Sequence, residues 1–404
     1  MGEIAYDIPV ERPMPRSLLV ARDYFPPQVG GISTIMARVM SEVAPREVCC
    51  LAGYRGDPYI ATPSGPARVY RAAFPFRLPT PFDTVALATA LSVIKLRHRT
   101  RALILATVGE GYIGLLARHL FNLPFVVFAH GNEVLSLRDS KWPRAIKSLC
   151  AASAVIANSR FTAGIVSDFG IPPERIRVIH PGCDPAEFRP IELDVATRDR
   201  LLGGQAHSFV LLTVGNLVER KGHDLVLQAV ASLRQAIPNL LYVIAGRGPY
   251  EEVLRELAHQ LGVADCVQFK GHVPQEDLIS LYASCDVFLM PSRFLPVDHD
   301  VEGFGIVYLE ASACGRAVIG GRSGGIEDAI LDGKTGLLVD PGEVGALEQA
   351  VLRLWRDRAL REALGAAGRK RILADLTWSH FGSRVRSVMN DCVHARIPRA
   401  NLQG

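Results

Sequence analysis

Two glutamates flank a glycine-rich segment late in the chain, where residues 302–310 read EGFGIVYLE. Gly303 and Gly305 let a backbone approach a ligand closely, and the apolar run behind them is typical of a helix start. Free N–H groups at a helix start bind phosphate or sugar oxygens. Glu310 lies one turn beyond Ile306, so its carboxylate returns to the same side. The segment suits a ligand with hydroxyls at both ends of a diphosphate, although two ordinary surface glutamates would share its charge pattern.

A basic turn lies earlier, where residues 214–223 read VGNLVERKGH. It follows an apolar, strand-sized run and precedes a predicted helix over 225–233. Arg220 and Lys221 are placed to neutralise the charge that develops on a diphosphate leaving group. Taken alone, the turn would also fit a solvated basic loop.

Two loops of the first half add candidate site residues. Gly30 and Gly31 precede a predicted helix over 32–43, whose N-terminus can meet a phosphate, although tight turns use glycine pairs routinely. His130 follows a predicted strand over 125–129 and precedes a glycine. Its imidazole can donate to or accept from a substrate, and a structural histidine is the alternative.

Short apolar runs alternate with longer amphipathic stretches along the whole chain, which predicts parallel sheets covered on both faces. The predicted strands are residues 17–20, 103–106, 125–129, 155–157, 209–214, 241–245, 267–269, 287–290, 317–319 and 336–339. A turn-rich stretch over 176–190 interrupts the rhythm, so we expect a domain boundary there. The fold class is therefore α/β, with two Rossmann-like, doubly wound domains facing each other across a cleft. Each candidate loop follows a strand, where open α/β sheets bind ligands.

Composition agrees with two globular domains. The chain has 404 residues, of which 49% are hydrophobic and 21% charged, and this length exceeds one ordinary core. A net charge of +4 argues against a dedicated nucleic-acid binder.

Cysteine usage and hydropathy indicate the compartment. None of the eight cysteines forms a Cys-x-x-Cys pair, so we expect reduced, mostly buried thiols. The N-terminus does not resemble a signal peptide, and no apolar run approaches the ~20 residues that span a bilayer. We therefore expect a cytoplasmic protein that at most contacts the inner face of the membrane.

Seven segments in order resemble the family-4 retaining glycosyltransferases with the GT-B fold. They are FPPxxGG (25–31), HGNE (130–133), NSxFT (158–162), PGCD (181–184), KG (221–222), GxGP (246–249) and EGFGIVYLE (302–310). Residues 300–303 and 321–325 are most similar to the phosphatidylinositol-mannoside mannosyltransferase branch. The resemblance implies an N-terminal acceptor domain over 1–188, a donor domain over 189–379, and a C-terminal helix from about 380–404 packing back on the first domain.

The resemblance also implies which residues bind the nucleotide. Lys221 would hold the donor phosphates with help from Arg220, and the Gly30–Gly31 loop would approach the diphosphate. Glu310 would bind the ribose hydroxyls. The turn near Val273 would contact the base through backbone groups.

The transferred sugar would lie between two further groups. Glu302 and the amides of Gly303, Phe304, Gly305 and Ile306 would bind it, and His130 would reach it from the other domain. The implied catalytic residues are His130, Lys221 and Glu302. Such enzymes usually need no metal, and we expect no cofactor beyond the nucleotide-sugar donor.

One position departs from the family pattern. Asn216 stands where relatives usually carry arginine, and losing one charge-assisted bond to a phosphate costs about 1.5–3 kcal/mol if nothing compensates. Arg220 or Arg293 could supply the charge. Asn216 belongs to the predicted donor site, and it also leaves room for a weak transferase.

These observations predict a retaining hexosyltransferase. Its donor would be GDP-mannose in the first place and otherwise a UDP-sugar, and its acceptor a lipid-linked, glycan or small-molecule hydroxyl. Basic segments at 70–77, 97–101 and 138–147 could engage an anionic lipid surface or acceptor. We expect a monomer or homodimer.

Three other functions share parts of this pattern. A nucleotide-sugar epimerase has the same architecture, and a catalytically silent nucleotide-sugar-binding module would fit Asn216. A nicotinamide-dependent dehydrogenase fits least, because Gly246-Arg247-Gly248 lacks the third glycine and the ribose-binding acid of that fingerprint.

Overall fold

The computed structural model describes residues 15–43, 47–53, 56–57, 59–60, 67–72, 81–138 and 143–394. Contacts between residues divide the chain into two compact units. Unit 1 comprises Met1–Phe128, Arg144–Val155 and Gly382–Gly404, and unit 2 comprises Ala129–Pro143 and Ile156–Phe381. Ala129–Pro143 thus groups with the second half of the chain, and the boundary near residue 188 stays a prediction.

The first sheet has eight strands in the order β3-β4-β2-β1-β5-β6-β7-β8. Their bounds are β1 Ser17–Ala21, β2 Val48–Gly53, β3 Tyr59–Ile60, β4 Ala67–Ala72, β5 Ala102–Leu105, β6 Phe125–Ala129, β7 Ala154–Ala157 and β8 Ile176–Val178. β1 pairs in parallel with β2 and β5, whereas β3 is antiparallel to β4. β1, β5, β6 and β7 are buried along their whole length, as expected for strands covered on both faces.

The helices of this part are α1 Gly31–Arg38, α2 Pro81–His98, α3 Gly111–Phe121, α4 Asn132–Leu135, α5 Pro143–Ala151 and α6 Arg160–Ser167, with 3-10 turns at Val108–Glu110 and Pro173–Arg175. The predicted helix over 32–43 is α1 continued by a π-helical turn, Val39–Val43. The C-terminal helix α15, Trp378–His394, returns to this turn: Arg386 Nη1 donates to the Glu42 carbonyl oxygen at 2.6 Å.

The second sheet has six strands in the order β11-β10-β9-β12-β13-β14, and every pairing between them is parallel. Their bounds are β9 Phe209–Val214, β10 Leu240–Ala245, β11 Val267–Gly271, β12 Val287–Met290, β13 Ala317–Gly321 and β14 Leu337–Val339. The connected helices are α7 Val195–Leu201, α8 His223–Ala236, α9 Glu251–Gln260, α10 Gln275–Ser284, α11 Ile306–Ala313, α12 Ile326–Ala329, α13 Val344–Arg356 and α14 Arg358–Asp375, with 3-10 turns at Glu219–Lys221 and Ala264–Cys266.

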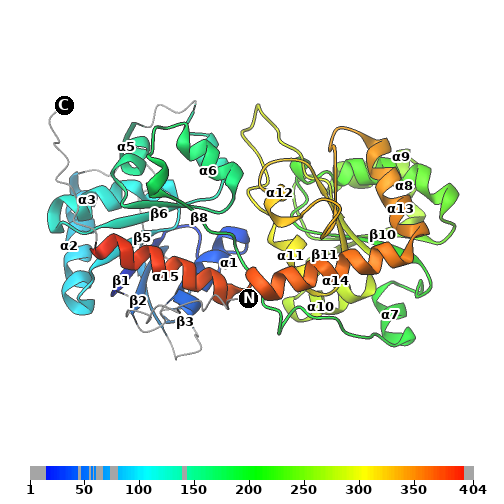
Figure 1. Cartoon of the computed structure of the whole chain (residues 1–404), viewed down its shortest axis with the longest axis horizontal. Coiled ribbons are helices and arrows are strands. Elements are labelled where there is room, and N and C mark those ends of the chain that lie inside the picture. The colour runs from blue at the N-terminus through cyan, green and yellow to red at the C-terminus, as the bar shows by residue number, and fades with distance from the viewer. Residues whose placement is uncertain are drawn as a thin grey trace, which may run out of the picture. The chain divides into compact units, whose positions relative to one another are not determined.

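Helices cover both faces of the second sheet. Leu211 and Leu289 face α8, α9 and α13, which lie together on one side (Figure 1). Val210 and Leu212 point the other way, into a cluster with α11 and α14. Each such aliphatic side chain contributes about 1.5–3 kcal/mol when fully buried. The two sheets, mostly parallel in the first and parallel in the second, confirm the predicted pair of Rossmann-like folds.

Strand order places a ligand site in the second sheet. The chain runs outward from β9 to β10 and β11, and then returns to the other side of β9 to form β12. The order therefore reverses between β9 and β12, and open α/β sheets bind ligands at this switch point. The two loops with the strongest sequence motifs leave the carboxyl ends of these two strands.

Candidate active site

The loop after β9 carries the two predicted phosphate-binding cations. Its Leu217 is fully buried and anchors the loop to the core. Gly222 has φ +72°, and a Cβ there would lie 2.4 Å from the Pro291 carbonyl oxygen. Glycine is therefore required for this loop to lie directly against the loop that follows β12.

Lys221 forms a buried ion pair with Glu302. The distance between Lys221 Nζ and Glu302 Oε2 is 2.5 Å, and the side chains are 10% and 12% exposed. Burial opposes the ionisation of Glu302, but the charges of Lys221 and then Arg220 hold its pKa below the ordinary value. Burial lowers the pKa of Lys221, and the Glu302 carboxylate opposes this shift. Lys221, which is predicted to bind the donor phosphates, is thus bonded to Glu302, which is predicted to bind the sugar.

Arg220 joins the same cluster. Its Nε donates to Asp300 Oδ1 at 2.7 Å, and its Nη1 lies 3.4 Å from Glu302 Oε2. Asn132 Nδ2 donates to the same oxygen of Asp300 at 2.5 Å. Two segments distant in sequence therefore converge on two carboxylates of a third segment.

The glycine-rich helix start is built by its own contacts. Gly305 has φ +90° and precedes the first residue of α11, Ile306. A Cβ on Gly303 would lie 1.9 Å from the His130 carbonyl oxygen. The missing side chain at Gly303 therefore leaves room for the His130 carbonyl, a contact that the sequence did not predict. The predicted approach of a ligand to the Gly303 backbone stays a prediction. Phe304 is buried and stacks on His180 with ring centroids 5.3 Å apart, so only its backbone can serve a ligand.

His130 lies against this helix start. It is buried, its backbone N–H donates to Glu133 Oε1 at 2.6 Å, and its carbonyl oxygen accepts from Asn158 Nδ2 at 3.0 Å. The structure thus brings His130 to Gly303 and, through Asn132, to Asp300.

Glu310 has a different environment from Glu302. It lies on α11, and the Tyr282 hydroxyl of α10 donates to its Oε2 at 2.7 Å. Burial raises the pKa of Glu310 to about 7; the hydrogen bond from Tyr282 opposes this shift and the charge of Glu187 adds to it. A carboxyl with this pKa exists in both protonation states near neutral pH.

Asn216 is exposed, and its carbonyl oxygen lies 3.5 Å from Nε2 of the buried His223. Of the two arginines proposed to replace its charge, Arg293 is bonded to Asp224 at 2.9 Å and to Glu219 at 3.2 Å. Arg220 is the arginine that reaches Glu302.

Three predicted binding positions remain, two glycines in unit 1 and one turn residue in unit 2. Gly30 and Gly31 belong to unit 1, where a Cβ on either would meet no atom within 4 Å, so they border open space. Val273 lies in the turn after β11, half-buried against the core. Whether these positions contact a donor stays a prediction.

The expectation of a metal-free enzyme overlooked one motif. Asp298 and Asp300 have the Asp-x-Asp spacing, but Asp300 binds Arg220 and Asn132 while Asp298 is exposed. Within the described ranges, no group of three or more His, Cys, Asp or Glu side chains is arranged to hold a metal.

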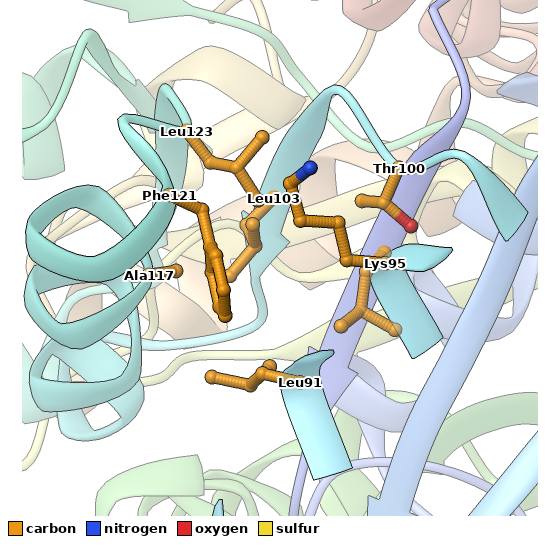
Figure 2. A pocket seen from close by; sticks show the side chains of 8 residues that line it. Leu91, Lys95, Thr100, Leu103, Ala117, Phe121 and Leu123 are labelled. Atoms are coloured by element: carbon orange, nitrogen blue, oxygen red, sulfur yellow. The ribbon is translucent and has the colours of Figure 1, made fainter. Parts of the chain in front are cut away.

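Figure 2 shows a pocket of unit 1 lined by Leu91, Lys95 and Phe121 among others. Its volume is about 10 Å³, the room of one water molecule. Such a water would satisfy the buried Thr100 Oγ1, which has no hydrogen-bond partner among the described residues. The pocket cannot hold a sugar or a nucleotide.

The predicted basic segments are only partly described. Residues 73–77 of the first segment and Lys141 and Trp142 of the third lie outside the described residues. No helix of the described chain is both long and apolar enough to cross a membrane. None of the eight cysteines, all of which the structure describes, is in a disulfide; Cys150 is exposed and the other seven are buried.

Sequence reasoning missed three residues of the site. Asp300 and Asn132 both stood in quoted motifs, and a polar side chain two positions from Glu302 was a signal that the same loop held a second acid. Tyr282 had no such signal, because it meets Glu310 only through the packing of two helices.

The chain is similar in sequence to known proteins. Residues 29–187 match the family described as Glycosyltransferase Family 4, and residues 202–371 match Glycosyl transferases group 1. A GDP-mannose-dependent alpha-(1-6)-phosphatidylinositol monomannoside mannosyltransferase of Mycolicibacterium smegmatis is 35% identical over 94% of this chain and 99% of its own. A GDP-mannose-dependent monoacylated alpha-(1-6)-phosphatidylinositol monomannoside mannosyltransferase of Corynebacterium glutamicum is 30% identical over 93% and 98%.

A solved structure shows the same fold. HepE of Anabaena, crystallised with UDP and glucose, aligns with a TM-score of 0.75 at 20% identity and covers 93% of this chain and 99% of its own. This likeness concerns the fold and agrees with the predicted GT-B architecture.

Proposed function

This chain belongs to the family-4 glycosyltransferases, and we propose that it transfers a mannosyl group from GDP-mannose to a hydroxyl of an inositol-phospholipid mannoside, with retention at the anomeric carbon. The names of the two mannosyltransferases support the donor and the acceptor class. The observation that carries the proposal is the convergence of Lys221 and Arg220 on Glu302 at the switch point of the second sheet.

The cluster suits the departure of a nucleoside diphosphate. Lys221 and Arg220 present preorganised positive charge to the leaving phosphates, in a site that is mostly shielded from water. Glu302 opposes the fall in the pKa of Lys221 that burial causes. In our proposal, Lys221 and Arg220 bind the diphosphate when the donor enters. The Glu302 carboxylate then accepts hydrogen bonds from the sugar hydroxyls.

Retention follows from departure and attack on the same face. The leaving diphosphate would accept the proton of the acceptor hydroxyl, while the cations stabilise its charge and the amides before α11 hold its oxygens. We propose no metal for this step, so EDTA should leave turnover unchanged; loss of turnover that Mg²⁺ or Mn²⁺ restores would contradict this part.

Donor choice is tested by thermal shift with GDP, UDP and ADP and with their sugars. A ligand at a hundredfold excess over its Kd stabilises the fold by about 2.7 kcal/mol, so GDP-mannose should raise Tm more than UDP-glucose. Transfer to the lipid mannoside is then measured by mass spectrometry of the product. A larger shift with the UDP series would overturn the GDP assignment.

Two further readouts separate the competing functions. A nucleotide-sugar epimerase would release a free epimerised sugar when no acceptor is present. A binding module would show calorimetric binding of GDP-mannose and no product in any acceptor assay. The uncharged Asn216, at a position where the family usually carries arginine, is the feature that favours the binding module.

We also propose that α2 contacts a lipid surface. Its exposed side includes Val85, Val93 and Leu96, which are 65%, 56% and 78% exposed, with Arg97 and Arg99 at its C-terminal end. Apolar side chains beside arginines suit the interface of an anionic membrane. The protein should co-sediment with vesicles containing phosphatidylserine and less with pure phosphatidylcholine, and Leu96→Glu should weaken the binding. Absence of binding to both would count against the contact.

A further inference from the structure

In the proposed diphosphate site, Asn216 stands at the position where the family usually carries arginine, so the second positive charge has to come from another residue. Asn216 is uncharged, and Arg293 already binds Asp224 and Glu219. Lys221 supplies one positive charge to a ligand group that carries about two negative charges. Arg220 is therefore the group able to complete the site.

Arg220 is held in a way that leaves donors for a ligand. Guanidinium offers five N–H donors in a fixed planar fork. Nε is bonded to Asp300 at 2.7 Å and Nη1 lies 3.4 Å from Glu302, while no described residue accepts from Nη2. Two nitrogens of the guanidinium are thus held by protein carboxylates, and Nη2 is left to bind a phosphate oxygen.

Asp300 is itself held from two sides. Asn132 Nδ2 donates to its side chain at 2.5 Å, and Asn132 Oδ1 accepts from the Val301 N–H at 2.9 Å. The backbone of Asp300 exchanges hydrogen bonds with Leu295 at 2.9 and 3.2 Å, which closes the loop behind it. A side chain fixed on both sides can orient another at little entropic cost.

We propose that Asp300, fixed by Asn132, is a positioning residue: it aims Arg220 at the donor diphosphate and so replaces the charge absent at Asn216. This inference rests on the proposed function. It adds to that function the residues that set the geometry of the second phosphate-binding cation.

A double-mutant cycle between Asp300 and Arg220 tests the proposal. The Kd of GDP is measured by calorimetry, and kcat and KM are measured with GDP-mannose, for the full chain and its D300A, R220A and D300A/R220A variants. Asp300→Ala should raise the Kd of GDP about tenfold and lower kcat, which corresponds to ~1.4 kcal/mol. In the R220A background the same change should alter the Kd by less than about twofold, because Asp300 then has no guanidinium to orient.

A matched control and a rescue complete the design. D298A removes an exposed carboxylate from the same loop, and its Kd should stay within about twofold of the wild type. N216R restores an arginine at the family position, so N216R/R220A should recover part of the GDP affinity and be insensitive to D300A.

The outcomes separate this inference from the proposed function. An unchanged Kd in D300A, or equal losses from D300A with and without Arg220, would overturn the positioning role while leaving the transferase assignment in place. If the wild type binds UDP in preference to GDP, the cycle is run with UDP, since both share the diphosphate. A wild type that binds neither nucleotide overturns both proposals.

Discussion

Glu302 and Glu310 flank the same helix start, and their carboxylates have different partners. Glu302 faces Lys221 and Arg220, whose charges hold its pKa below the ordinary value. Glu310 faces the neutral Tyr282 hydroxyl, and burial raises its pKa to about 7. One acid thus serves as a fixed charge inside an ion cluster, and the other takes up a proton near physiological pH. A shared motif does not imply a shared electrostatic role.

The largest expected effect comes from removing the charge of Lys221, the partner of Glu302. Lys221→Met keeps the length of the side chain and removes its charge, so the leaving diphosphate loses a preorganised cation. We expect kcat with GDP-mannose to fall by about 10²–10³-fold, whereas Glu310→Gln should act mainly on KM. Near-normal turnover of K221M with a native circular dichroism spectrum would break the comparison.

Glu302→Gln should cost stability as well as activity. It leaves Lys221 buried without its counter-charge, and breaking a buried pair from one side costs about 3 kcal/mol in the free energy of unfolding. Urea denaturation measures the loss. The double variant E302Q/K221M should be more stable than E302Q; if the two losses simply add, the pair does not act as a unit.

Glu310 should make donor affinity depend on pH. Ribose hydroxyls donate to the ionised carboxylate, and a group with a pKa of about 7 is about ten times less ionised at pH 6 than at pH 8. The Kd of GDP-mannose, whose own diphosphate stays ionised over this range, should therefore be about tenfold higher at pH 6. Glu310→Gln should remove the dependence, and an unchanged slope in that variant would contradict the assignment.

The same titration has the opposite effect on folding stability. The folded protein binds the Glu310 proton more tightly than the unfolded chain does, because its pKa is raised from 4.5 to about 7. Its contribution is fully present below pH 4.5 and is lost as the pH rises through about 7. Acid therefore favours the fold at this residue while it weakens the donor site.

Tyr282→Phe should give the smallest effect. The hydroxyl of Tyr282 opposes the rise in the pKa of Glu310, so its removal should move the midpoint of the binding profile to higher pH. At pH 7 we expect a two- to threefold loss of GDP-mannose affinity, or about 0.5 kcal/mol. Calorimetry across pH measures the shift, and a midpoint that moves to lower pH would show that the hydrogen bond favours the protonated acid.

Much of the fold could be predicted because the central strands are continuous apolar runs. The predicted bounds of β6, β9 and β12 are those observed. β4 was missed because its sequence ARVYRA mixes arginines with apolar residues and pairs at the side of the sheet near β3. β2 was also missed, although VCCLAG is an apolar run.

The candidate site was predictable only in part. The cations of the 214–223 turn and the acids of the 302–310 motif could be found, because each motif is local in sequence. The bond between Lys221 and Glu302 could not, since it depends on two neighbouring strands ending side by side. The contact between Gly303 and the His130 carbonyl could not be predicted, because His130 belongs to a segment far away in the sequence. Contact of the Gly303 amide with a ligand stays a prediction.

The membership of residues 129–143 in unit 2 has a consequence for dividing this protein. A gene cut at the predicted boundary near residue 188 would give one polypeptide with Asn132 and His130 and another with Asp300 and Gly303. Neither piece would contain both Asn132 and Asp300, which together hold Arg220. The two pieces should therefore regain full GDP affinity only when they reassemble. Such a pair could serve as a split reporter whose signal is nucleotide binding.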